Sequence, residues 1–196
     1  MKIGEQHKKT KGGFTLIETF VAITILLLAV AGPMTLASRS LASASFSKDQ
    51  IIAFYLAQEA IEYIRHTRDS NQLATAWGTP TDWLSGLDGV GGTPNCFSPN
   101  KCKIDVQATA GSDISICNNP PGNNCPPLLY NTVTHFYTYE TGNPTPFTRE
   151  VTLERIPGTI PGPNDEVKIN VTIRWKSGFL PERTFLMKEN IYNWLP

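Results

Sequence analysis

Apolar residues gather in one long block near the start of the chain. Residues 14–31 read FTLIETFVAITILLLAVA, interrupted only by threonines and by Glu18. A helix of this length spans roughly 27 Å, enough to cross the hydrocarbon core of a bilayer. The block is too long for a cleaved secretory signal peptide, and it lacks the polar face of a core helix in a soluble protein. We therefore predict a membrane-spanning helix.

Further along, apolar positions recur at helical spacing. Phe54, Ala57, Ile61 and Ile64 follow an i, i+3, i+7, i+10 pattern that predicts one buried stripe on an amphipathic helix. The charged side chains of this segment lie largely off the stripe: Glu59, Glu62, Arg65 and Arg68. The helix is expected to end either at residues 69–71 or near Trp77.

Gly32 and Pro33 fall between these two helical segments. Proline has no N–H and its ring crowds the preceding turn, so a local break in the helical hydrogen bonds is expected here.

Strict alternation marks the end of the chain. Residues 167–176 alternate apolar and polar side chains, which predicts a strand with one buried and one solvated face. Residues 148–156 and 183–194 are predicted as two further strands, and residues 130–139 as a candidate fourth. The expected fold class is α+β, with a long N-terminal helix packed against a C-terminal antiparallel β-sheet.

The region between helix and sheet, residues 78–147, is rich in glycine and proline, and it holds Cys96, Cys102, Cys117 and Cys125. An even number of cysteines favours two disulfides. Local bridges (96–102 and 117–125) and nested bridges (96–125 and 102–117) both remain open; the nested pair would join a hairpin of residues 103–107 and 113–117. A zinc site is the alternative, although these spacings differ from those of zinc knuckles.

Charge is unevenly placed in a chain with no net charge. The first thirteen residues carry four lysines against Glu5, a local charge of about +3, and no comparable basic cluster follows the apolar block. Because positive flanks stay in the cytoplasm, we expect a single-pass protein with its N-terminus inside and its C-terminus outside. The remainder is slightly acidic, so no nucleic-acid partner is evident.

Candidate chemistry is sparse. His7, His66 and His135 are scattered, and the nucleophile, metal, phosphate and dinucleotide motifs are missing from the sequence. The aspartates at 82, 88 and 105 are interpreted as turn or surface residues. We expect no enzyme activity, no catalytic residue, no cofactor and no metal.

The residues before and inside the apolar block form a specific motif. Lys11 to Glu18 read KGGFTLIE, which joins a short basic leader, a glycine, an aromatic residue and a glutamate to an uninterrupted apolar run. This segment resembles the prepilin signal of type IV pilins and of the pseudopilins of type II secretion. The segment LAQEAIEYIRHTRDSN (56–71) is similar to the corresponding helix of PilV-like minor pilins. The C-terminal strands resemble that group more loosely.

The resemblance implies roles for individual residues. Prepilin peptidase would cut between Gly13 and Phe14 and N-methylate Phe14, and Gly13 would be small to fit the peptidase. Cleavage frees a positively charged amine at Phe14, at the N-terminus of the helix. The positive end of the helix dipole lies there too, and it also favours a nearby anion. A buried carboxylate needs a partner, so Glu18 is expected to set the register between subunits by meeting the amine of a neighbour. A snorkelling interfacial carboxylate is the alternative.

The expected organisation follows from these observations. A leader (1–13) is removed, and a transmembrane and polymerisation helix (14–37) continues as an amphipathic helix (38–77). A disulfide-stapled region (78–147) and the sheet of the head (148–196) complete the chain.

The resemblance further implies a structural subunit, of the minor kind, of a type IV pilus or a secretion-like pseudopilus. Its partners would be prepilin peptidase, other pilin or pseudopilin subunits, the inner-membrane assembly platform and membrane lipid. It would reside in the cytoplasmic (inner) membrane and then in a periplasmic or extracellular filament. The alternative is a membrane-tethered extracellular binding domain that does not polymerise.

Overall fold

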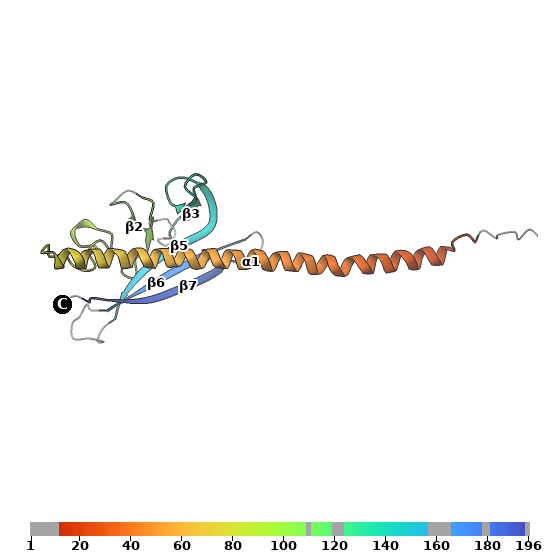
Figure 1. Ribbon diagram of the computed structural model, residues 1–196, viewed down its shortest axis with the longest axis horizontal. Coiled ribbons are helices and arrows are strands. Elements are labelled where there is room, and N and C mark those ends of the chain that lie inside the picture. Colours follow the sequence, from red (N-terminus) through yellow and green to blue (C-terminus); the bar gives the residue numbers. More distant parts are fainter. Residues whose placement is uncertain (1–11, 109–110, 119–123, 157–165, 178–180, 195–196) are drawn as a thin grey trace, which may run out of the picture. The chain divides into compact units, whose positions relative to one another are not determined.

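The computed structural model describes residues 12–108, 111–118, 124–156, 166–177 and 181–194. The chain divides into two compact units, unit 1 (Met1–Lys48) and unit 2 (Asp49–Pro196). One helix, α1 (Leu16–Ala76), begins in unit 1 and ends in unit 2 (Figure 1). The described part of unit 2 also holds the sheet, which gives the predicted α+β fold class.

In unit 1, α1 contains a candidate membrane span. An 18-residue window of the helix is apolar enough to cross a bilayer, and none of that window is buried within the protein. Leu16, Phe20 and Leu28 are each more than 70% exposed, as suits side chains that would face lipid rather than a protein core. The expectation of a long apolar helix is therefore confirmed.

The helix does not end at Gly32 and Pro33. α1 is continuous across both residues, with Pro33 inside it. Pro33 has no N–H for the carbonyl of Ala29, so one helical hydrogen bond is missing by covalent structure. The predicted loss is thus a single bond within a continuing helix, rather than a boundary between two helices.

In unit 2, α1 buries one stripe against the sheet. The buried apolar residues are Ala53, Leu56, Ala57, Ala60, Ile61 and Ile64. Phe54 does not belong to this stripe, which corrects the sequence prediction: it is 43% exposed and meets Phe185 edge-on at 6.2 Å between ring centroids. Alanines at three positions leave room for the sheet to approach the helix closely. The helix ends at Ala76, the later of the two expected ends.

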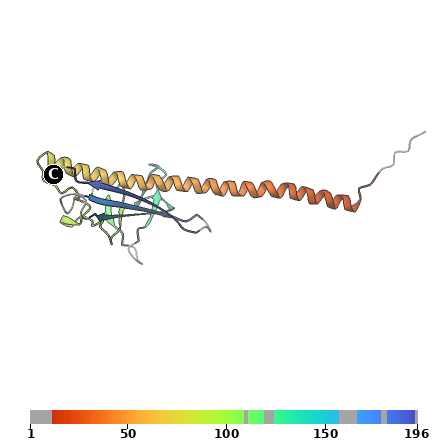
Figure 2. The same ribbon diagram turned by 90° about the horizontal axis from the view of Figure 1, so that it is seen from below.

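Three long strands form the main part of the sheet. β5 (Asn143–Arg155), β6 (Glu166–Trp175) and β7 (Arg183–Tyr192) are antiparallel neighbours in chain order. Val151 pairs with Val171, and Val171 pairs with Met187. The predicted meander is confirmed, although β5 starts five residues earlier than expected because residues 143–148 pair with β3. Figure 2 shows this sheet running beneath α1 within unit 2.

The loop-rich region contains short strands as well as turns. β1 (Cys102–Ile104) and β2 (Ile114–Ile116) form the expected hairpin, with Lys103 opposite Ser115. The candidate strand at 130–139 is instead two strands, β3 (Pro127–Tyr130) and β4 (Tyr137–Thr138), joined by a turn. His135 adopts a φ of 62° in that turn, which a continuous strand would not allow. A 3-10 turn, η1 (Val90–Gly92), precedes them.

Both disulfides are local. Cys96 bonds to Cys102, and Cys117 bonds to Cys125. All four side chains are at most 5% exposed. The hairpin of the nested alternative is present without the nested bridges, because Cys102 pairs in the ladder with Ile116 rather than Cys117. With its thiols bonded in pairs, this cluster offers no zinc site.

A buried charge lies in the core between α1 and the sheet. Arg149 on β5 is fully buried and its guanidinium contacts the Glu59 carboxylate of α1. It also donates to the carbonyls of Leu56, at 2.9 Å, and of Ile104. Burial alone would lower the pKa of Arg149, but Tyr139 and Glu59 hold it above its usual value. This side chain links helix, central strand and hairpin.

Candidate functional site

Glu18 lies in the first turn of α1. The helix begins at Leu16, and the Glu18 N–H donates to the Thr15 side-chain hydroxyl at 3.4 Å and to its carbonyl at 3.1 Å. Thr15 therefore caps the helix, and Thr15-x-x-Glu18 has the sequence of a capping box. The acidic side chain also suits the positive end of the helix dipole. The Thr15 and Glu18 pair is visible in the sequence as a helix-start signal, in addition to its place in the apolar block.

The carboxylate of Glu18 has no partner in the described part of the chain. It makes neither a hydrogen bond nor an ion pair there. Its neighbours Ile17 and Phe20 are exposed and apolar. An ionised carboxylate on an apolar surface is expensive in a membrane, so a partner must come from elsewhere or the group must reach water.

The other polar side chains of residues 14–37 are satisfied by the helix itself. Thr19 donates to the carbonyl of Leu16 at 2.8 Å, and Thr35 donates to that of Gly32 at 2.7 Å. Thr24 bonds in the same way to Phe20. Such back-bonding removes the need for external partners in lipid. Among the described polar side chains of this segment, Glu18 alone is left without a bonded partner for its charged group.

The glycines near the motif have no packing reason to be glycine. A Cβ atom built at Gly12, Gly13 or Gly32 meets no atom within 4 Å. Phe14 is 78% exposed beside Gly13. Packing within the described chain therefore places no demand for a glycine at position 13.

Comparison with family models, with curated proteins and with solved structures gives no match.

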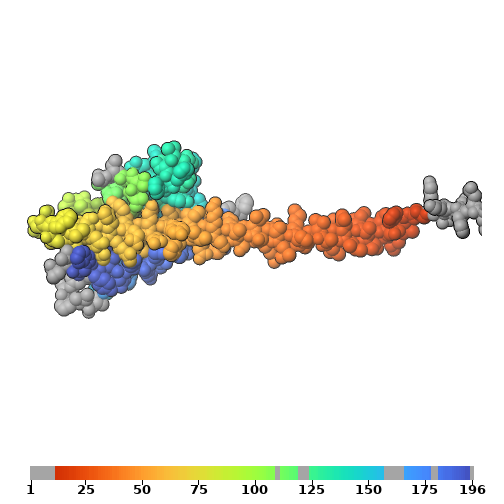
Figure 3. Space-filling model, in the orientation of Figure 1, coloured from red at the N-terminus to blue at the C-terminus, as the bar shows by residue number. Residues whose placement is uncertain are grey.

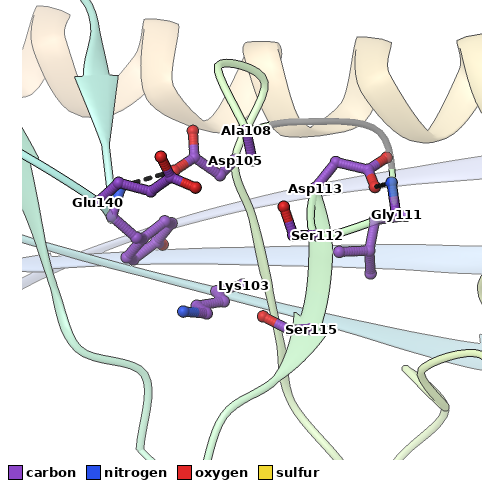
Figure 4. A pocket seen from close by; sticks show the side chains of 10 residues that line it. Lys103, Asp105, Ala108, Gly111, Ser112, Asp113, Ser115 and Glu140 are labelled. Carbon is purple, nitrogen blue, oxygen red and sulfur yellow. Dashed lines mark hydrogen bonds between the residues drawn. The ribbon is translucent and has the colours of Figure 1, made fainter.

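A hollow in unit 2 is lined by residues of the β1–β2 hairpin region together with Tyr139 and Glu140 (Figure 4). Its volume is about 350 Å³, and carboxylates of Asp105 and Asp113 line opposite sides. Asp105 accepts bonds from the Thr138 hydroxyl and the Tyr139 N–H, both at 2.7 Å. Through these two bonds, the Asp105 carboxylate connects the hairpin to residues 138–139. The described residues include no group of three or more potential metal ligands.

Asp113 is hydrogen-bonded to the helix α1. Its carboxylate accepts a hydrogen bond from the Tyr63 hydroxyl of α1. Burial would raise the pKa of Asp113, but the bond from Tyr63 and backbone N–H groups, including that of Gly111, hold it below its ordinary value of 3.8. Burial, together with the carboxylate, raises the pKa of Tyr63. The two walls of the hollow thus serve to dock the hairpin onto the core.

One face of α1 in unit 2 lies at the surface. Figure 3 shows helix residues of this unit (yellow to orange) uncovered, with segments coloured green to teal on one side and blue on the other. Large side chains stand exposed near the end of the helix, with Trp77 at 82% and Trp194 at 53%. The Trp194 ring nitrogen donates to Asp69 at 3.3 Å. Sequence reasoning did not single out these residues, because exposure of an aromatic side chain leaves no mark in the local pattern.

Proposed function

We propose that this chain is a structural subunit, of the minor kind, of a type IV pilus or a type II secretion-like pseudopilus. In this role it is not an enzyme. The observation that carries the proposal is Glu18, a carboxylate on the apolar part of α1 without a partner among the described residues. The prepilin-like motif around it supplies the partner that is needed.

Cleavage between Gly13 and Phe14 would place a new α-amino group at the start of α1, in the cytoplasmic half of the membrane. The amine of one subunit then neutralises Glu18 of the next, within a layer of low dielectric where an unpaired charge is costly. A pair of this kind fixes the register between helices more than it adds stability. The internally bonded threonines leave Glu18 as the group through which register would be set.

The open surroundings of Gly13 support the assignment of the cut site. No atom of the described chain would clash with a side chain there, so the protein's own packing does not explain the glycine. An external peptidase that needs an unhindered bond does explain it. The two disulfides support a head on the oxidising side of the membrane.

The assembly role is tested with two matched substitutions, each of which replaces a polar residue in the apolar segment with leucine. We expect Glu18→Leu to be cleaved normally but to fail to enter filaments or to cross-link with neighbouring subunits. Thr24→Leu, whose hydroxyl only bonds within the helix, is expected to assemble. Normal incorporation of Glu18→Leu would count against the register role and would favour the alternative, a tethered binding domain that does not polymerise.

The cut site is tested separately. We expect Gly13→Val to retain its leader, because a branched side chain crowds the scissile bond, while Gly12→Ala is processed. A mature chain starting at Phe14 in Gly13→Val, detected by intact mass, would reject the cut-site assignment.

A further inference from the structure

Three side chains meet beside the disulfides of unit 2 in an arrangement with its own chemistry. The Lys101 amino group lies 3.5 Å from the side-chain oxygen of Asn124. The same amino group lies 3.2 and 3.1 Å from the two carboxylate oxygens of Glu150. A primary amine therefore touches both a carboxamide and a base.

The two reacting segments are held together by the surrounding structure. Lys101 and Asn124 each precede a buried disulfide cysteine, Cys102 and Cys125. The backbone N–H of Cys117 donates to the Lys101 carbonyl at 2.8 Å, which ties the second disulfide loop to the first. These links hold the amine and the amide at a fixed separation instead of leaving them to meet by diffusion. Holding two reactants in place in this way can remove a large part of the activation barrier of a bimolecular reaction.

Glu150 is oriented for proton transfer. Its side chain is only 4% exposed, and Arg174 binds both of its oxygens, at 2.9 and 2.8 Å. Arg174 keeps the carboxylate in place while both oxygens still reach Lys101. Lys101 is itself three-quarters buried, with 25% of its side chain exposed. Its amino group therefore contacts the Glu150 carboxylate directly, in a largely buried setting.

We propose that Lys101 and Asn124 form an intramolecular isopeptide bond, with Glu150 as the proton carrier. Glu150 takes a proton from the Lys101 ammonium, and the free amine attacks Cγ of Asn124. The C–N bond to the Lys101 nitrogen forms, and the bond from Cγ to the amide nitrogen of Asn124 breaks. Glu150 returns its proton to that nitrogen, which leaves as ammonia. Glu150 then takes the second proton from the Lys101 nitrogen, which becomes the neutral amide N–H, and passes this proton to the departing ammonia to give ammonium. The reaction needs no oxidant, reductant or second substrate.

The product would be a covalent link that does not depend on redox state. It would join the start of β1 to the segment before Cys125, across the two disulfide loops, and would persist when both disulfides are reduced. This inference concerns the head and does not depend on the proposed role in a filament.

The test uses the full chain, purified after expression with its disulfides formed, reduced and analysed by intact mass. The expected mass is lower than that of the linear reduced chain by one ammonia. A tryptic digest is expected to contain a branched peptide that joins Lys101 to Asn124, with no cleavage after Lys101. An unshifted mass, with ordinary linear peptides over both residues, would overturn the proposal.

Variants separate this bond from other losses of ammonia, such as cyclisation of an asparagine with its own backbone. Lys101→Arg and Asn124→Ala are each expected to abolish the mass shift, with their disulfides intact when measured without reductant. Lys168→Arg, at a lysine that contacts the carboxylate of Glu154, is expected to keep the shift. A shift that persists in Lys101→Arg would overturn the assignment.

The role of Glu150 is tested by rate. Glu150→Gln is expected to slow bond formation by about a hundredfold, followed as the linked fraction over time. Bond formation at the rate of the unmodified sequence in this variant would overturn the role of Glu150 as the proton carrier.

Discussion

Replacing Glu59 with glutamine leaves the guanidinium of Arg149 in the core without the carboxylate that it contacts. Arg149 has no exposed surface, while the Glu59 side chain is 28% exposed. Glutamine keeps the size and an accepting oxygen but removes the negative charge. Removing one partner of a buried ion pair typically destabilises a protein by about 3–5 kcal/mol.

Two features of the site place the effect at the lower end of that range. Water reaches one side of Glu59, and the carbonyls of Leu56 and Ile104 still accept bonds from the guanidinium. We therefore expect Glu59→Gln to lower the free energy of unfolding of the head by about 3 kcal/mol. For a domain of this size the transition temperature falls by on the order of 6–12 °C.

The measurement is urea unfolding of the full chain in detergent, followed by near-ultraviolet circular dichroism of the head. Glu154→Gln is the matched control, since Glu154 faces Lys168 across neighbouring strands and is 55% exposed. Exposed pairs contribute about 0–1 kcal/mol, so the control should change little. Adding Arg149→Met to Glu59→Gln should recover part of the loss, because the unpaired charge is then removed. Equal effects of Glu59→Gln and Glu154→Gln would refute the reasoning.

Two further predictions concern the hairpin and a turn. Tyr63→Phe should destabilise the head at neutral pH, because the pKa of Asp113 then rises toward its ordinary value. A carboxylate with a lowered pKa adds to the free energy of unfolding above pH 3.8, and this contribution is lost as pH falls through its pKa in the folded protein. The difference in free energy of unfolding between the unmodified protein and Tyr63→Phe should therefore vanish below the folded pKa of Asp113. A difference that grows with acidity would contradict this. Gly142→Ala should destabilise the head by about 1–3 kcal/mol, because its Cβ would lie 2.6 Å from the carbonyl oxygen of Tyr130. Gly91 also has a positive φ, of 69°, but open space around it, so Gly91→Ala is the control for backbone strain without a clash. The thermal unfolding loss for Gly142→Ala should exceed that for Gly91→Ala, and equal losses would argue against the clash.

Periodic patterns predicted the elements whose burial repeats regularly. The alternation over residues 167–176 matches β6 to within a residue at each end, because that strand lies between β5 and β7 and buries one face along its whole length. The helix was predicted for the same reason. Phe54 was misplaced because its ring lies at the border of the buried stripe, where Phe185 covers only one side.

Other features depend on contacts between distant segments, which local patterns do not contain. In the sequence, Arg149 looks like a solvent-facing polar residue of a strand. In the structure it points into the core, where its guanidinium donates to the Glu59 carboxylate and to two carbonyls from α1 and β1. The disulfide pairing follows from the register of β1 against β2, which the spacing of the cysteines left open. At the candidate site, the motif located Glu18 without the structure, and the structure added that its charge is unpaired in the described chain.

In the proposed function, the chain is trimmed so that a new amine at Phe14 can meet Glu18 of a neighbour. Intact-mass and N-terminal analysis of the native protein, isolated from membranes of its own cells, tests this most directly. We expect a chain that starts at Phe14, carries one added methyl group on its amine and contains two disulfides. A native chain that still begins at Met1 would lack the positive partner of Glu18 and would refute the proposed assembly role.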